Sequence, residues 1–300
     1  METQAPRRLS LTVTPAQSGE KIDTLLRRDL HLSGTVIRRI KQLEDGILLD
    51  GVRAITGQRA AEGQVLSVLV SDPCPRLDMA PTPGSIDVVY EDEDVLVVNK
   101  APGLPVHPGP GRPDGTLCNH IAWYYQQTGL LADIHLVHRL DRGTSGLMVV
   151  AKHAHAQEQL KLQLHTPAFR RIYLAVCDGA PQPPSGTVDA PIARAPGSVI
   201  ARRVDPEGQW ARTRYRTLRA ANGRSLVELE LDSGRTHQIR VHMAHLGCPL
   251  TGDFLYGTED QSLISRPALH SARLSLTHPV TGASMCWELP LPPDMAALLA

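Results

Sequence analysis

The spacing of apolar residues changes once along the chain and divides it into two parts. In the first part the spacing is helical, because apolar residues between Glu20 and Leu30 recur every three or four positions. A second helix is predicted from a cap at Ser33 to an end at Gly46. The pattern then becomes that of a small β-ribbon, with a strand at 47–49, a tight turn at 50–51 and a closing strand at Val65–Val70.

From Ile86 onward, short runs with the alternation of half-buried strands dominate. Strands are predicted at Val95–Val98, Gly146–Ala151, Arg171–Cys177, Arg212–Arg219, Ser225–Leu231, Leu269–Leu276 and Met285–Leu289. Helices are predicted at Thr116–Gln127, His155–His165 and Thr236–Leu246. Many strands with few helices favour an α+β fold with a mixed, largely antiparallel sheet and flanking helices.

The boundary between the two parts is rich in proline, with four prolines in residues 72–85. Such a segment is typical of a semi-extended linker. We therefore expect a tail at 1–19, a small domain at 20–72, a linker at 73–85 and a large domain at 86–300, with the small domain mobile relative to the large one.

The small domain, with two helices and a β-ribbon, resembles the α-L RNA-binding motif of a ribosomal small-subunit protein. Arg38, Arg39 and Lys41 lie on the polar side of its second helix and are candidate phosphate contacts. A solvated charged face on an accessory domain explains the same charges equally well.

Charge and cysteine content narrow the class of protein. Lys plus Arg and Asp plus Glu number 31 each, so the formal net charge is +0, whereas nucleic-acid-binding domains are usually basic. A neutral total can still contain a basic face. No apolar run approaches the roughly 18 residues of a membrane helix, and no apolar signal segment follows Arg7 and Arg8. We expect a cytoplasmic monomer that binds no membrane. The five cysteines lack metal-ligand spacing, which argues against a disulfide framework or a zinc ribbon.

The densest cluster of reactive residue types lies within residues 136–152 and is centred on Asp141. Asp141 stands between Arg139 and Arg142, in a glycine-containing loop before a buried strand. Nearby cations favour an ionised carboxylate, and a carboxylate on a rigidly held loop can act as a nucleophile or stabilise a positive charge. The alternative is an ordinary surface ion pair or a capped turn.

A second cluster, residues 231–247, contains a predicted helix capped by Thr236. Arg235 and Arg240 lie at its start, where an anion is favoured. The partner would be a phosphate or a carboxylate such as Asp141. The alternative is an amphipathic helix with a solvated polar side.

Other chemistries lack their motifs. The glycine-rich segment 97–116 has neither the order of a Walker loop nor the spacing of a dinucleotide fingerprint. His242 and His245 have no third ligand nearby in the sequence, so no metal site is expected. A glycosidase needs two cooperating carboxylates, and the acidic run from Glu91 to Asp94 is interpreted as a solvated turn before a strand.

Six segments together resemble the RluA-type family of pseudouridine synthases, which modify uridines in ribosomal or transfer RNA. Three segments match the main motifs of the family, His138–Gly146 (HRLDRGTSG), Arg170–Val176 (RRIYLAV) and Gly234–Arg240 (GRTHQIR). Three more also fit, Val98–Gly103 (VNKAPG), Gly252–Gly257 (GDFLYG) and Leu269–Ser271 (LHS). Along the chain they follow the order of the family and cover roughly residues 86–290.

The resemblance implies a pseudouridine synthase fold and assigns roles to four residues. Asp141 is the catalytic aspartate, Arg139 displaces and holds the target base, Tyr173 stacks on the flipped uracil, and Arg240 pairs with Asp141. Arg142 and Arg235 are further RNA-binding candidates. The isomerisation is redox-neutral, so no cofactor is expected, and ribosomal RNA is favoured over transfer RNA as the substrate.

Two other functions fit part of the pattern. A glycosidase or nucleosidase that uses Asp141 would need a second carboxylate beside it and would release a free base. A non-catalytic RNA-binding factor would be expected to lack Asp141, Tyr173 or Arg240, and all three are present.

Overall fold

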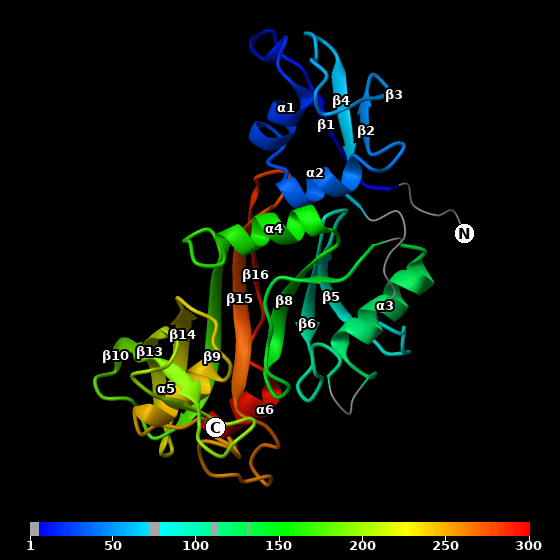
Figure 1. Ribbon diagram of the computed structural model, residues 1–300. Helices are drawn as coiled ribbons and strands as arrows, with labels where there is room; N and C mark the ends of the chain where they lie inside the picture. Colours follow the sequence, from blue (N-terminus) through cyan, green and yellow to red (C-terminus); the bar gives the residue numbers. More distant parts are fainter. Residues whose placement is uncertain (1–5, 72–78, 110–112, 131) are drawn as a thin grey trace.

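The computed structural model describes residues 6–71, 79–109, 113–130 and 132–300. They form a small unit at the amino-terminal end and a large unit built on a long sheet (Figure 1). The small unit has an antiparallel sheet in the order β1-β4-β2-β3. Its elements are β1 (Arg8–Thr12), the 3-10 turn η1 (Pro15–Gln17), α1 (Ile22–Arg28), α2 (Gly34–Ile40), β2 (Ile47–Leu49), β3 (Val52–Arg53) and β4 (Val65–Leu69).

Two boundaries of the small unit differ from the prediction. The segment expected to be a tail contains β1, which pairs with β4 from Arg8 to Thr12. Its partner lies more than fifty residues later in the chain, and such a pairing is set by tertiary contacts. Helix α2 ends at Ile40, and the chain reaches Gly46 through turns. The Ser33 cap is confirmed, because its side chain accepts a hydrogen bond from the backbone N–H of Val36 at 3.3 Å.

The large unit contains a ten-stranded sheet whose main path is β10-β13-β14-β9-β15-β8-β6-β5. Its strands are β5 (Asp87–Glu91), β6 (Val95–Lys100), β7 (His135–Leu136), β8 (Ser145–Ala151), β9 (Arg170–Asp178), β10 (Ser185–Asp189), β13 (Arg212–Ala221), β14 (Arg224–Leu231), β15 (Leu269–Thr277) and β16 (Ser284–Glu288), with a separate hairpin of β11 (Ile192–Arg194) and β12 (Arg202–Val204). Its helices are α3 (Leu117–Thr128), α4 (Ala154–Gln163), α5 (Gln238–His245), α6 (Pro293–Ala296) and the 3-10 turn η2 (Ala297–Leu299).

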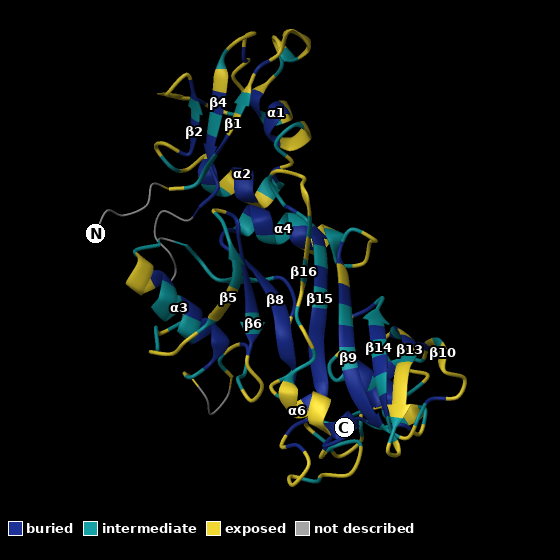
Figure 2. Cartoon of the chain, turned by 180° about the vertical axis from the view of Figure 1, so that it is seen from behind, coloured by how far each residue is buried: buried dark blue, intermediate teal, exposed yellow. Residues whose placement is uncertain are grey.

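The predicted α+β class with a mixed, largely antiparallel sheet is confirmed. Among the described strand pairs only β8 with β15 is parallel. Each strand and helix predicted in the large unit is present, and no end differs by more than two residues. The strands at the centre of the sheet are buried on both faces, whereas β10 and β16 keep exposed positions (Figure 2).

Helices cover both faces of the sheet. On one face, Ile121 of α3 and Met243 of α5 share an apolar cluster with alternate residues of β6, such as Leu96. On the other face, Leu160 of α4 packs in a second cluster with the intervening residues of β6, such as Val97. No helix among the described residues is long and apolar enough to span a bilayer.

Strand β15 joins the two halves of the sheet. Its first residues pair with β8 on one side, and most of its length pairs with β9 on the other. Gly146 is needed at this seam, because its φ is +107° and a Cβ there would lie 2.3 Å from the carbonyl oxygen of Ser271. The seam therefore brings the Asp141 loop, which precedes β8, next to the half that contains Tyr173.

The small unit contacts the opposite end of the central strands. Arg7 donates two hydrogen bonds to Asp94, at 2.9 and 3.0 Å, and Gln159 of α4 donates to the carbonyl of His31 at 3.1 Å. Helix α2 lies beside α4 in both views (Figures 1 and 2). The expected mobility of the small domain stays a prediction, and residues 72–78 of the proline-rich segment lie outside the described residues. From Val95 to Lys100, β6 spans about 17 Å, which separates this junction from Asp141.

Candidate active site

Asp141 lies in the loop between β7 and β8, and its side chain remains 28% exposed. Two reciprocal bonds hold this loop against the segment that follows β6. The Nε of Arg142 donates to the carbonyl of Gly103 at 2.9 Å, and the N–H of Gly103 donates to the carbonyl of Arg142 at 2.8 Å. The loop is thus fixed through its main chain while the carboxylate remains accessible.

Lys100 adds a buried positive charge behind the loop. Its Nζ donates to the carbonyls of Ala101, Leu104 and Arg142 at 2.8, 2.9 and 3.2 Å. Burial lowers the pKa of Lys100 to about 7, and the charge of Asp141 acts in the opposite direction. Three carbonyl acceptors match the three protons of an ammonium group, so the protonated form fits this position.

Arg240 of α5 approaches Asp141 from the other half of the sheet, with Nη1 3.9 Å from Oδ2. Its short contacts are with Asp253: Nε and Nη2 each donate to one of its carboxylate oxygens at 2.7 Å. Burial acts to lower the pKa of Arg240, but the hydrogen bonds and charge of Asp253, with the charge of Asp141, raise it. The predicted pairing with Asp141 is therefore the longer of two ion pairs, and Asp253 positions the guanidinium.

Aromatic rings cover the same guanidinium. Its central carbon lies 5.0 Å from the ring centroid of Tyr256 and 5.5 Å from that of Phe254. The Tyr256 hydroxyl also lies 2.8 Å from Nδ1 of His237 and accepts from the N–H of Arg202 at 2.8 Å. Arg240 is thus fixed by charge, by hydrogen bonds and by stacking.

The start of α5 differs from the prediction. His237 occupies the N-cap position in a left-handed conformation, with φ at +57°, and Thr236 does not cap the helix. The Gln238 side chain organises this turn instead, because its Oε1 accepts from Ser233 Oγ at 2.8 Å and from the Arg235 N–H at 2.9 Å. The strained turn presents His237 to the pocket.

Asp141, Tyr173 and Arg240 line one cavity of about 530 Å³, a size suited to a small ligand. Of the described residues that line this cavity, Asp141 is the only acid. Tyr173 lies on β9 and is 4% exposed; burial raises the pKa of its hydroxyl, which stays protonated at neutral pH. The cavity therefore combines one accessible carboxylate, fixed cations and an aromatic ring.

The predicted RNA-binding residues fall into two places. Arg139, Arg142 and Arg235 line the cavity and are exposed. In contrast, Arg38, Arg39 and Lys41 lie on or just after α2, at the distant junction between the units. Arg38 and Lys41 are exposed, whereas Arg39 is half-buried and donates to the carbonyl of Val70 at 3.2 Å. The three side chains therefore do not form one exposed face.

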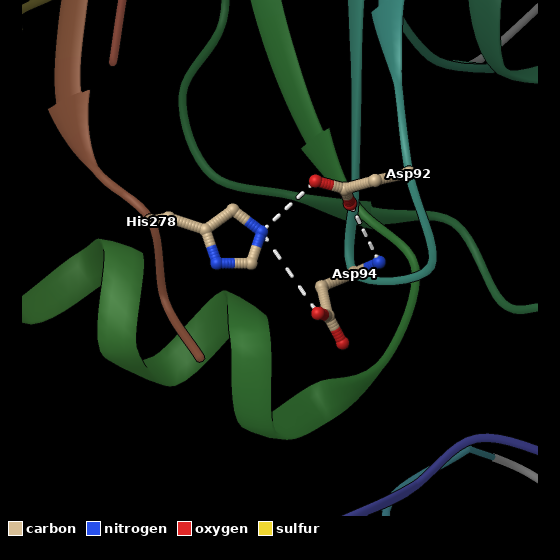
Figure 3. A group of neighbouring side chains, drawn as sticks. All are labelled: Asp92, Asp94 and His278. Carbon is tan, nitrogen blue, oxygen red and sulfur yellow. Dashed lines mark hydrogen bonds and ion pairs between the residues drawn. The ribbon is translucent and has the colours of Figure 1, made fainter. Parts of the chain in front are cut away.

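At the junction, Asp92, Asp94 and His278 bring groups of metal-ligating type within 4.8 Å of one another (Figure 3). Each already has a partner in the chain. His278 Nε2 lies 3.0 Å from Asp92 Oδ2, and Asp94 binds both Arg7 and His153 Nε2, the latter at 2.9 Å. The acidic run expected to form a solvated turn therefore includes a buried residue, Asp94, that is 3% exposed. Local spacing could not predict this, because the partners lie far away in the sequence.

Sequence reasoning missed three residues of the site: Lys100, Asp253 and Tyr256. Their segments were identified, as VNKAPG and GDFLYG, but no role was assigned to them. The signal was their residue type, since a lysine within a buried strand and an acid in a Gly-Asp turn are rarely buried without a partner.

Comparisons with known proteins find relatives over most of the chain. A family model described as "RNA pseudouridylate synthase" matches residues 94–245. "Uncharacterized RNA pseudouridine synthase YjbO" of Bacillus subtilis is 43% identical over 271 residues, covering 90% of this chain and 89% of its own. "Ribosomal large subunit pseudouridine synthase D" of Escherichia coli K12 is 37% identical over 309 residues, covering 97% and 93%. The solved structure "Human RNA Pseudouridylate Synthase Domain Containing 4" superposes with a TM-score of 0.58 at 27% identity, covering 70% of this chain and 90% of its own.

Proposed function

The chain belongs to the RNA pseudouridylate synthase family and is an RNA pseudouridine synthase of the RluA type, an intramolecular isomerase; on this premise we propose that it acts on uridines of large-subunit ribosomal RNA, with Asp141 as its catalytic carboxylate. The ribosomal assignment is supported by the similarity to the E. coli large-subunit synthase, which extends over both units of the chain.

The observation that carries the assignment of Asp141 is its setting. It is the one acid among the described residues of the cavity, it remains accessible, and Arg240 lies 3.9 Å away. Arg240 is held by Asp253, so it supplies positive charge without neutralising Asp141 through a short bond. A carboxylate held in this way is ready to interact with a developing cation.

The reaction breaks the bond between ribose C1′ and uracil N1, turns the base, and joins C1′ to C5. The proton leaves C5, and N1 gains one, so the product is an isomer. The Asp141 carboxylate acts at the sugar: it attacks C1′, shields an oxocarbenium-like ribose, or removes a ribose proton. Each of these roles needs the ionised form and an open approach to the carboxylate.

The uridine must first leave the RNA stack, which costs a few kcal/mol. Arg139 is exposed at the rim of the cavity and makes no hydrogen bond or ion pair with the residues that the structure describes, so it is free to occupy the vacated position. Tyr173 offers a ring inside the cavity on which the extruded uracil stacks. Arg142 and Arg235 then contact the phosphates on either side.

A glycosidase or nucleosidase is the rival enzyme, and it needs a second carboxylate in the site. Asp253 is a carboxylate that contacts the same arginine, Arg240. Its side chain is fully buried, and both of its oxygens bind the guanidinium. Asp253 is therefore not free to act as an acid or a base on a substrate.

The test is to incubate the purified protein with transcripts of large-subunit ribosomal RNA and of transfer RNA, and to map pseudouridine at single-nucleotide resolution. We expect conversion at defined uridines of the ribosomal transcript. Asp141→Asn keeps the shape and removes the charge, so turnover should fall at least about a thousandfold while the Kd for RNA changes by less than about threefold. Glu259→Gln, an exposed acid elsewhere, is the control. Comparable conversion by Asp141→Asn would remove the assignment, and conversion of transfer RNA alone would change the substrate.

A further inference from the structure

Trp210, just before β13, is a large apolar side chain that stays 46% exposed. Its indole N–H donates to Asp189 Oδ1 at 3.1 Å, and the guanidinium carbon of Arg212 lies 5.5 Å from its ring centroid. Arg212 is itself held by two hydrogen bonds to Asp189, at 2.6 and 3.0 Å. The ring is therefore fixed in orientation although it remains in water. Rigid exposed rings of this kind serve as stacking platforms for nucleic-acid bases.

Trp210 lines a hollow of about 580 Å³ that adjoins the catalytic cavity. The two share Leu164, His165 and Leu231 in their walls. Arg235, which lines the catalytic cavity, donates from Nε to the carbonyl of Trp210 at 3.0 Å. The hollow thus lies next to the pocket proposed to receive the uridine, and its volume suits one small planar group.

The charges of the hollow indicate what it binds. Its two arginines are already paired, Arg170 with Glu230 at 2.7 Å and Arg214 with Asp232 at 2.8 Å. The hollow therefore offers an aromatic ring and paired charges, and both of its arginines are already neutralised by acids. An uncharged heterocyclic base fits this lining better than a phosphate does.

We propose that the hollow binds a second, unpaired base of the substrate RNA, which stacks on Trp210 next to the flipped uridine. The inference rests on the proposed function and adds a specificity subsite to it. Extrusion of the uridine removes a stacking partner from its neighbours. A second platform beside the cavity recovers part of that loss and selects RNAs in which a nucleotide near the target is free to turn out.

The test uses the full chain and an RNA stem-loop that contains the uridine mapped above. We compare wild type with Trp210→Ala, Trp210→Leu and Trp210→Phe, and with Leu218→Ala as the matched control, an exposed apolar residue of β13 that lines neither cavity. Loss of one stacked base corresponds to a rise in Kd of about 5- to 150-fold. We expect that rise for Ala and Leu, less than about threefold for Phe, and no change for Leu218→Ala. The single-turnover rate at saturating enzyme should stay within about threefold, because Trp210 touches no reacting atom.

The partner base is located with RNAs that lack one base at a time among the unpaired positions around the uridine. With the wild-type protein, removal of the base at one position should raise the Kd by the same factor as the Trp210→Ala substitution does. With the Trp210→Ala protein, the RNA that lacks this base should bind as tightly as the intact RNA. Equal effects of all abasic RNAs on both proteins would overturn the subsite, as would equal binding by Phe and Leu variants. Failure of wild type to convert any uridine would instead overturn the proposed function.

Discussion

Two arginine–aspartate pairs among the described residues differ in their surroundings, because the arginine of one pair, Arg240, lines the cavity of Asp141. At the junction of the two units Arg7 holds Asp94, and in the large unit Arg240 holds Asp253, each through two hydrogen bonds. Around Asp94 the remaining groups are also bound, since His153 donates to the carboxylate. Arg240 also makes a longer ion pair, in which its Nη1 lies 3.9 Å from Oδ2 of Asp141.

This difference separates a structural charge network from the one that we propose to be reactive. At the junction Asp92, Asp94 and His278 each have partners among the described residues. In the cavity the arginine is fixed by a dedicated partner, so the second carboxylate stays accessible in a positive field. An incomplete network is therefore a better indicator of function than the number of charges in a cluster.

Of the substitutions that test the difference between the two ion pairs, Asp253→Asn should have the largest effect on stability and turnover. It leaves a buried guanidinium without its counter-charge, which costs about 3–5 kcal/mol of folding free energy. Arg240 should then turn toward Asp141 and neutralise it, so turnover should fall by about a hundredfold. Thermal unfolding and single-turnover assays at saturating RNA measure both effects. Asp141→Asn, which removes an exposed charge, should lose turnover with little change in Tm; loss of neither property in Asp253→Asn would refute the positioning role.

Asp94→Asn should show the opposite profile. Breaking the junction pair should lower the free energy of unfolding by about 3 kcal/mol, because Arg7 loses its buried partner, yet single-turnover conversion should stay unchanged. The control is Glu93→Gln, which removes the 60% exposed partner of the same arginine and should cost less than about 1 kcal/mol. A turnover defect in Asp94→Asn would mean that the junction communicates with the cavity.

Acid should destabilise the protein through the junction histidines. His153 Nδ1 accepts from the N–H of Ala156, so it must remain unprotonated to cap α4. Burial lowers the pKa of His153, and it lowers that of His155 to about 4. The unfolded chain, with histidine near 6.5, then binds more protons, so this stability is complete above about pH 6.5 and is lost as the pH falls toward 4.

The measurement is the free energy of unfolding between pH 7 and 5. The slope should be about 1.4 kcal/mol per pH unit for each histidine that is kept neutral. His155→Leu should make the slope shallower, whereas a change at the exposed His107, which is far along the chain from α4, should not. An unchanged slope in His155→Leu would show that other groups are responsible.

The smallest effect should come from the exposed cations of the small unit. Arg38→Ala combined with Lys41→Ala should weaken binding of the full ribosomal transcript a few-fold and make its salt dependence shallower by about one to two phosphate contacts. Binding of a short stem-loop should not change. Arg53→Ala on β3 is the control. If affinity and salt slope both stay the same, the small unit is an accessory domain and does not bind RNA.

Periodicity predicted the elements whose apolar faces are buried, and it failed where no such face exists. Strand β5 at the sheet edge has no buried residue, and β10 has one, Val188. The position of β15 between the two halves could not be predicted from the sequence either, because neighbours in a sheet are set by tertiary contacts. For the same reason Asp141 and Arg240 could be selected from their motifs, whereas the choice of Asp253 as the closest partner of Arg240 could not.

The central position of β15 has a consequence for folding during synthesis of the chain. The strand that joins the Asp141 half to the Tyr173 half begins at Leu269, more than 120 residues after the segment that it pairs with in β8. Contacts between segments so distant along the chain form slowly and late. During synthesis the two halves of the sheet are therefore made before the strand that joins them. The cavity between them can be completed only after β15 has been synthesised. A chain that ends before Leu269 lacks the strand that joins the Asp141 loop to the half with Tyr173.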